Sequence, residues 1–278
     1  MTPPVRTLAE FAPLLPELAV VFGAFGLLML DLFIDERRRV VTHALSIATL
    51  LVAAAFILFG VGGHGEVMEG LFFRDTASDL IKLVMLLVSA AALVYLWPFM
   101  RERGLYRGEV SILVLFAVIG MMLLVSAGNL TMIYLGLELM ALCSYALVAV
   151  DRDSKLASEA GMKYFVLGSL SSGLLLYGLS LIYGATGSLY LDEINAAAAV
   201  LAGEDRVLLL GGLVFAVAGV AFKFGAAPFH MWLPDTYHGA PTPITLFIGS
   251  APKLAALGLA WRLFQQGMGP LADNWQLL

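Results

Sequence analysis

The feature that most constrains this chain is a series of apolar stretches separated by short clusters of charge. Each is long enough for a helix to cross the hydrocarbon core of a bilayer, which takes about 20 apolar residues. Hydrophobic residues make up 60% of the chain and charged residues 13%, whereas soluble domains carry about 25% charge. The stretches lie at 14–34, 42–61, 77–97, 110–127, 129–150, 157–184, 207–233 and 243–265. The sequence therefore predicts an all-α, polytopic transmembrane bundle of about eight helices.

Charge and motif content exclude several classes of function. The net charge is −5 and no long basic stretch is present, which argues against a nucleic-acid partner. The single cysteine, Cys143, offers neither a disulfide framework nor a cysteine metal site. No G-x-G-x-x-G motif follows a strand, and no C-x-x-C or H-E-x-x-H motif occurs. We therefore expect no cofactor or metal site in this chain, and a lipid bilayer around it.

Basic residues are distributed unequally between the two sets of connections. Only Arg74 and Arg206 fall in the connections on one side. The connections on the other side hold Arg37, Arg38, Arg39, Arg101, Arg103, Arg107, Arg152 and Lys155. Because cytoplasmic loops are enriched in Lys and Arg, this bias predicts that both ends of the chain lie outside. We expect a bacterial inner (cytoplasmic) membrane with the N-terminus on the periplasmic side.

Two connections carry structural predictions of their own. Gly128 and Asn129 alone separate the fourth and fifth stretches, so these should form a tight helical hairpin. The stretch at 189–206 has helical residues but is too short in its apolar part to span, which predicts a short helix at the membrane surface.

Four ionisable side chains fall well inside predicted crossings: Glu138, Lys163, Lys223 and Lys253. Each would cost about 2.5 to 3.5 kcal/mol near a helix centre if unpaired, so together they would cancel a fold's stability. They must be paired, hydrated or neutralised. Such residues in a membrane mark ion pathways by default.

Polar neighbours accompany the first of these charges. Thr131, Tyr134 and Tyr145 are spaced seven and four residues before Glu138 and seven after it, which places all four on one helix face. This polar stripe should face other helices rather than lipid.

Two prolines lie close to the charged positions. Pro228 follows Lys223 by five residues, and Pro252 directly precedes Lys253. A proline inside a helix displaces the carbonyl four residues back, here those of Phe224 and Ile248. Broken helices beside buried charges recur in transporters, so we expect the seventh crossing to be broken.

The charges and one histidine, His230, suggest a proton relay through Glu138, Lys163, Lys223, His230 and Lys253 if water joins them. Structural alternatives stay open at this stage. Glu138 could form a static ion pair, and Lys163 lies near enough to a helix end for its side chain to extend to the interface. Lys82, near the outer end of the third crossing, is expected to reach the interface in that way.

Four sequence stretches resemble the antiporter-like subunits of respiratory complex I, most closely the subunit N branch of that family. They are LLPELAVVFGAFGLLMLDLF at 14–33, YLGLELMALCSYAL at 134–147, EAGMKYFVLGSLSSGLLLYG at 159–178 and AFKFGAAPFHMWLPDTYHGAPTPITLFIGSAPKLAALG at 221–258. The last is highly specific, and the resemblance covers essentially the whole chain.

The resemblance implies a role for each charged position. Glu138 and Lys223 match the family's charged pair in the fifth helix and the broken seventh helix. Lys253 matches the eighth-helix lysine at the centre of the hydrophilic axis, and Lys163 a sixth-helix lysine of the subunit N branch. His230 matches a histidine that links Lys223 to Lys253.

The resemblance also implies an organisation into two parts. Residues 1–108 would form an N-terminal three-helix segment, and 109–278 the first of two inverted five-helix, antiporter-like repeats. Family members continue through a second repeat with its own broken helix, which we expect to be absent from this chain.

The function implied is that of a membrane-arm subunit of proton-translocating NADH:quinone oxidoreductase, a translocase subunit without a redox centre of its own. FMN, iron–sulfur clusters and quinone would belong to partner subunits, and its neighbours would be other membrane-arm subunits. Two alternatives remain: a subunit of a multisubunit cation/proton antiporter, or a static structural or assembly subunit.

Overall fold

The computed structural model describes residues 8–35 and 38–277, so the predicted inner-loop residue Arg37 lies outside the described part. Within those ranges, eight helices are long and apolar enough to cross a membrane, which confirms the predicted transmembrane fold. They are Glu10–Asp31, Val40–Leu58, Thr76–Glu102, Gly108–Val125, Leu130–Val148, Lys155–Thr186, Gly203–Phe224 and Thr242–Gly267.

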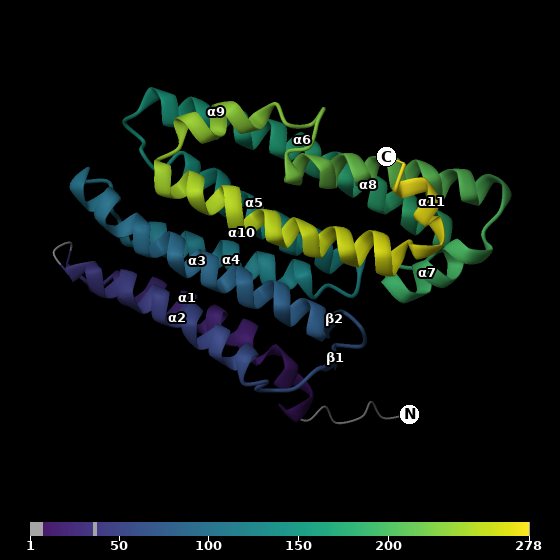
Figure 1. Cartoon of the computed structure of the whole chain (residues 1–278), viewed down its shortest axis with the longest axis horizontal. Helices are drawn as coiled ribbons and strands as arrows, with labels where there is room; N and C mark the ends of the chain where they lie inside the picture. The colour runs from purple at the N-terminus through teal and green to yellow at the C-terminus, as the bar shows by residue number, and fades with distance from the viewer. Residues whose placement is uncertain (1–7, 36–37, 278) are drawn as a thin grey trace.

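The long helices lie side by side along the long axis of the molecule (Figure 1). They are α1 (Leu15–Asp31), α2 (Val40–Leu58), α3 (Thr76–Glu102), α4 (Gly108–Val125), α5 (Leu130–Val148), α6 (Lys155–Thr186), α8 (Gly203–Phe224) and α10 (Thr242–Ala260). A two-stranded antiparallel hairpin, β1 (Gly65–Val67) and β2 (Phe72–Arg74), precedes α3. We call the two ends of the bundle the β-hairpin end and the α1–α2 end, the latter after the connection between those helices.

Short helices complete the structure. They are the 3₁₀ helices η1 (Leu8–Leu14) and η4 (Gly269–Leu271), the α-helices α7 (Leu191–Val200), α9 (Trp232–Gly239) and α11 (Ala272–Trp275), and the π-helix η3 (Trp261–Gly267). Helix α7 confirms the short, non-spanning helix predicted at 189–206.

Helix α4 occupies the centre of the bundle, since 78% of its membrane-spanning residues are buried inside the protein. It forms the predicted hairpin with α5, because α4 ends at Val125 and α5 begins at Leu130. The Asn129 side chain caps α5 by accepting a hydrogen bond from the Met132 N–H at 2.8 Å. Gly120 of α4 lies against the Gly136 backbone of α5, where a Cβ would come within 2.6 Å of the Gly136 carbonyl oxygen. Glycine there lets the two helices approach closely.

The break in the seventh crossing differs from the predicted one in its cause. Helix α8 ends at Phe224 because Gly225 adopts the left-handed conformation, with φ of 71°. The predicted role of Pro228 is therefore wrong: it lies in the turn after the helix has ended, and displaces no helical carbonyl. The chain resumes as α9, whose Trp232 indole N–H donates to the Phe222 carbonyl oxygen at 2.9 Å. The same carbonyl also accepts from the Gly225 N–H at 3.0 Å, so the indole adds a second donor at the end of α8.

The other proline, Pro252, lies inside a helix that continues past it. Pro252 is buried, and α10 runs without interruption from Thr242 to Ala260. Lys253 is thus presented from a continuous helix, in contrast to Lys223, which lies in the last turn before a break.

Candidate functional site

Glu138 and Lys223 each carry a buried polar atom without a hydrogen-bond partner among the described residues, and the Glu138 side chain as a whole is only partly buried. The Oε1 atom of Glu138, on α5, and the Nζ atom of Lys223, on α8, are both inaccessible to solvent. Lys223 is 8% exposed as a whole. No ion pair joins the two side chains in the described part of the chain, yet the carboxylate is close enough to act electrostatically on the ammonium. The arrangement is two opposite charges in one apolar region, available for pairing but not paired.

The local fold of α8 explains how an ammonium is tolerated there. Lys223 lies in the last helical turn, where the unsatisfied carbonyls and the negative end of the helix dipole favour a cation. Its Nζ atom also lies 5.8 Å from the centroid of the Phe222 ring. The break in the seventh crossing therefore contributes directly to the environment of this lysine.

Lys163 is paired with two carboxylates. Its Nζ atom lies 2.8 Å from Glu159 on its own helix and 2.9 Å from Asp235 on α9. The side chain is 44% exposed. Lys163 is therefore both accessible at the surface of the protein and ion-paired. Sequence reasoning missed both partners. The i, i+4 spacing of Glu159 is a signal that could have revealed it, whereas nothing local points to Asp235.

Lys253 and His230 occupy different surroundings. Lys253 is partly buried, and its Nζ atom lies 5.9 Å from the ring centroid of Tyr237, whose hydroxyl is buried and finds no partner among the described residues. His230 is exposed in the turn before α9, and its imidazole makes no described hydrogen bond or ion pair. Among the described residues, no hydrogen bond therefore links His230 to Lys223 or Lys253.

A row of aromatic rings connects the region of α5 to that of α10. The ring centroids of Tyr145 and Tyr164 are 4.7 Å apart, those of Tyr164 and Trp232 are 4.7 Å apart, and those of Trp232 and Tyr237 are 6.1 Å apart. These rings pack α9 against α6. The hydroxyls of Tyr145 and Tyr237, at the two ends of the row, are both buried without described partners.

Cavities lie at both ends of the polar stripe on α5. Toward the β-hairpin end, a cavity of about 200 Å³ is lined by Thr131 and Tyr134, one turn from Glu138. Toward the α1–α2 end, a cavity of about 630 Å³ reaches Tyr145, two turns from Glu138. Glu138 thus lies between the two cavities along α5. Across the described residues, no cluster of three or more His, Cys, Asp or Glu side chains is placed to hold a metal ion.

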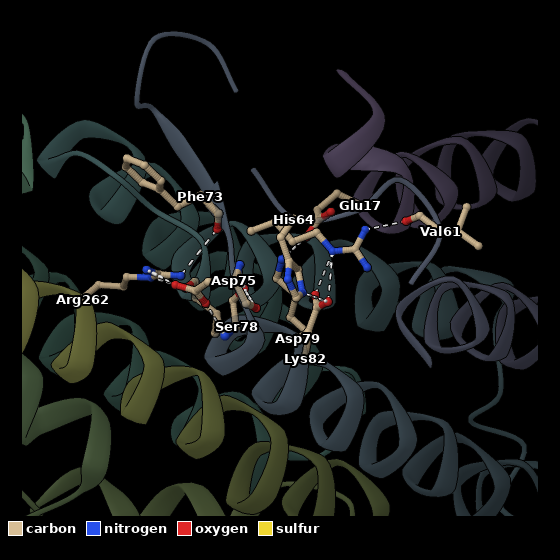
Figure 2. A network of polar contacts seen from close by, with 11 residues as sticks. Glu17, Val61, His64, Phe73, Asp75, Ser78, Asp79, Lys82 and Arg262 are labelled. Atoms are coloured by element: carbon tan, nitrogen blue, oxygen red, sulfur yellow. Dashed lines mark hydrogen bonds and ion pairs between the residues drawn. The ribbon is translucent and has the colours of Figure 1, made fainter. Parts of the chain in front are cut away.

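A second charged network lies outside the predicted site, at the β-hairpin end (Figure 2). The expectation that Lys82 reaches the membrane interface is wrong, because its side chain is fully buried and its Nζ atom lies 2.5 Å from Glu17 on α1. Lys82 shares the inward face of α3 with Met85, Leu86 and Ser89, which directs it into the bundle. Nearby, Arg74 donates to Asp79 at 2.9 Å.

The same end holds a buried arginine that links distant segments. Arg262, in η3, is 2% exposed and donates to the Val125 carbonyl at 2.8 Å and to Asp75 Oδ2 at 2.9 Å. Burial alone would raise the pKa of Asp75, but the Ser78 backbone N–H and the Arg262 guanidinium outweigh it and hold that pKa below its usual value. Asp75 is the N-cap of α3, so Arg262 fixes the end of α10 to the beginning of α3.

The chain is similar in sequence to a known family of membrane proteins. Residues 127–277 match the family described as NADH:quinone oxidoreductase/Mrp antiporter, TM. The chain is 61% identical over 272 residues to NADH-quinone oxidoreductase subunit N of Xanthomonas euvesicatoria pv. vesicatoria, covering 98% of this chain and 55% of that protein. It is 48% identical over 273 residues to subunit N of Thiobacillus denitrificans, covering 97% and 56%. The chain thus spans about half the length of the curated relatives that it matches.

Solved structures agree with these relatives. A chain of respiratory complex I from Thermus thermophilus superimposes with a TM-score of 0.75 at 31% identity, covering 89% of this chain and 52% of that one. A chain of the Mrp complex from Dietzia sp. DQ12-45-1b superimposes with a TM-score of 0.76 at 22% identity, covering 95% and 50%, which shows the fold alone. The resemblance noted in the sequence is confirmed, and this chain belongs to the NADH:quinone oxidoreductase/Mrp antiporter transmembrane family.

Proposed function

We propose that this chain is a membrane-arm subunit of proton-pumping NADH:quinone oxidoreductase, and that protons move through Glu138, Lys223, Lys163, His230 and Lys253. The observation that carries the proposal is the Glu138–Lys223 arrangement, in which a partly buried carboxylate and a buried ammonium lie near each other without direct pairing. A charged side chain is costly in lipid unless an opposite charge lies nearby. Protonation of Glu138 would therefore make the charged form of Lys223 less favourable, and deprotonation of Lys223 would do the same to the carboxylate. That coupling is what a relay requires.

The proposal extends to the assembly. The 61% identity to a subunit N supports other membrane-arm subunits as partners, with quinone, FMN and iron–sulfur clusters carried by partner chains. Residues 1–108 form the N-terminal three-helix part and 109–278 the first antiporter-like repeat, a division that falls where α3 gives way to α4. The arginines gathered at the α1–α2 end support a cytoplasmic position for that end, which places the N-terminus on the periplasmic side.

The test is proton pumping measured together with NADH:quinone turnover in native membranes carrying Lys223→Ala or Glu138→Gln. Both variants should lose pumping by more than about tenfold, in keeping with the contribution of a positioned proton-transfer group. Lys155→Ala removes an exposed lysine from the first turn of α6 and is the matched control, with no loss expected.

Undiminished pumping and turnover in both variants would rule out the relay. Cation-dependent proton exchange without any NADH-linked activity would instead assign the chain to the multisubunit antiporters, whose Mrp member shares its fold.

A further inference from the structure

The largest of the cavities described here does not belong to the proton path. It has a volume of about 890 Å³ and lies at the α1–α2 end, where α1, α2, α3 and α4 come together. Its lining is mostly polar and includes Asp31, Trp97, Arg101, Tyr106, Arg107 and Glu109. The α1–α2 and α3–α4 connections, with the helix ends beside them, thus line one charged opening.

Cations exceed available anions in this cavity. Arg101 and Arg107 form no ion pair in the described part of the chain. Of the two lining carboxylates, Glu109 is bound by Arg152 at 2.8 Å. The guanidinium groups favour a phosphate, which they bind through two parallel N–H donors.

The other carboxylate is already held by the protein. Asp31 Oδ1 accepts a hydrogen bond from the Thr42 hydroxyl at 2.7 Å. Its oxygens also lie beside Gly108, about 2.1 Å from where a Cβ would be, at the beginning of α4. Neither α2 nor α4 has a side-chain cap at this end, so their first N–H groups add positive potential to the cavity wall.

The floor of the cavity is uncharged and aromatic. The Tyr106 hydroxyl lies 2.9 Å from Ser111 Oγ, and burial raises the pKa of Tyr106 to about 12, so the phenol remains neutral at physiological pH. The Trp97 ring stacks on His43 at 5.3 Å, and the Arg101 guanidinium lies 5.8 Å from the Trp97 ring. Tryptophan at the end of a membrane helix is characteristic of the head-group layer.

Apolar side chains flank the opening. Leu30, Leu32 and Phe33, at the end of α1, are 50%, 74% and 87% exposed. These apolar side chains would not contribute to binding a free anion, whereas the acyl chains of a lipid would pack against them.

From this placement we propose that the cavity binds the phosphate head group of an anionic phospholipid, with Arg101 and Arg107 on the phosphate and the acyl chains against the exposed end of α1. Basic pockets between transmembrane helices are the recurrent means of holding such lipids. The inference uses no residue of the proposed proton path and stands independently of it.

The test is native mass spectrometry of the full-length purified chain titrated with phosphatidylglycerol, phosphatidylcholine or inorganic phosphate. The wild-type chain should retain phosphatidylglycerol in preference to phosphatidylcholine. Arg101→Gln/Arg107→Gln should weaken that binding by about thirtyfold, as expected for two arginines at a membrane surface. Arg101→Lys/Arg107→Lys keeps the charge but not the two parallel N–H donors, and should recover part of the affinity, which separates lost binding from misfolding.

The matched control is Arg103→Gln/Lys155→Gln, which removes two exposed charges outside the cavity; Arg103 lies over the Phe99 ring at 3.6 Å. This control should bind like the wild type. The proposal is overturned if both double glutamine variants lose affinity equally, or if the wild-type chain retains the two lipids equally. Arginine-dependent binding of inorganic phosphate without lipid retention would assign the cavity to a free anion and also overturn it.

Discussion

The ammonium of Lys163 lies 2.9 Å from the carboxylate of Asp235, and this contact joins the sixth crossing to the short helix that follows the break in the seventh. Helix α9 is thereby held against α6 by one charge pair in addition to the stacked Tyr164 and Trp232 rings. Aromatic packing does not respond to protonation, but the charge pair does. Under the proposed function, the pair is therefore the part of the α6–α9 contact that would change with protonation.

Asp235→Asn should lower NADH-driven proton pumping by more than about tenfold, because Lys163 would keep only the Glu159 contact within its own helix. Thermal unfolding should change little, since both side chains are about half exposed. Glu159→Gln is the control, because it leaves the Lys163–Asp235 contact in place. An equal loss in both variants, or no loss in Asp235→Asn, would contradict the inference.

The buried Glu17–Lys82 pair gives a prediction about stability. Glu17→Gln or Lys82→Met alone should lower the free energy of unfolding by about 3 to 5 kcal/mol, because each leaves an uncompensated buried charge. The double variant Glu17→Leu/Lys82→Met should unfold within about 1 kcal/mol of the wild type or be more stable. Unfolding in detergent micelles measures all three, and a double variant as unstable as the sum of the single ones would contradict this.

Arg262 should matter far more to stability than a surface arginine does. Arg262→Met removes the contacts to Val125, Asp75 and Gln266, and should cost about 3 to 5 kcal/mol. Arg152→Met removes the exposed pair with Glu109 and should cost less than about 1 kcal/mol. Similar unfolding midpoints for the two variants would show that the link between α10 and α3 is not a stabilising one.

The break after α8 gives a matched pair of glycine variants. Gly225 and Gly187 have φ of 71° and 73°, so alanine at either position should cost about 1 to 2 kcal/mol for the left-handed backbone. A Cβ at Gly225 would also come within 2.4 Å of Leu233 Cδ1, whereas Gly187 has open space. Gly225→Ala should therefore be the less stable variant and should also reduce pumping by displacing α9. Equal unfolding midpoints would argue against steric control of the break.

Much of the fold could be predicted because its causes are local. Stretch length and hydropathy predicted the eight crossings, and Gly128–Asn129 predicted the hairpin between α4 and α5. The seventh crossing was the partial failure. Its break was expected from Pro228 but follows from the left-handed Gly225, and a lone glycine in an apolar stretch gives no distinctive signal.

The candidate site divides in the same way. The charges Glu138, Lys163, Lys223 and Lys253 stand out in sequence because any charge in an apolar stretch is costly. Their partners cannot be recognised in this way. Asp235, which pairs with Lys163, lies in a polar segment where a carboxylate is not unusual. For His230 the sequence resemblance predicts a role linking Lys223 to Lys253, but the side chain lies exposed in a turn.

The sequence by itself determined that this protein crosses a membrane and which ionisable residues lie within the crossings, because both follow from the free energy of placing apolar and charged groups in lipid. Only the tertiary structure decided which charges meet. It buried Lys82 against Glu17, joined Lys163 to Asp235, and left Glu138 and Lys223 near each other but unpaired. Pairing depends on distances between helices far apart in the chain, and no local pattern encodes those distances.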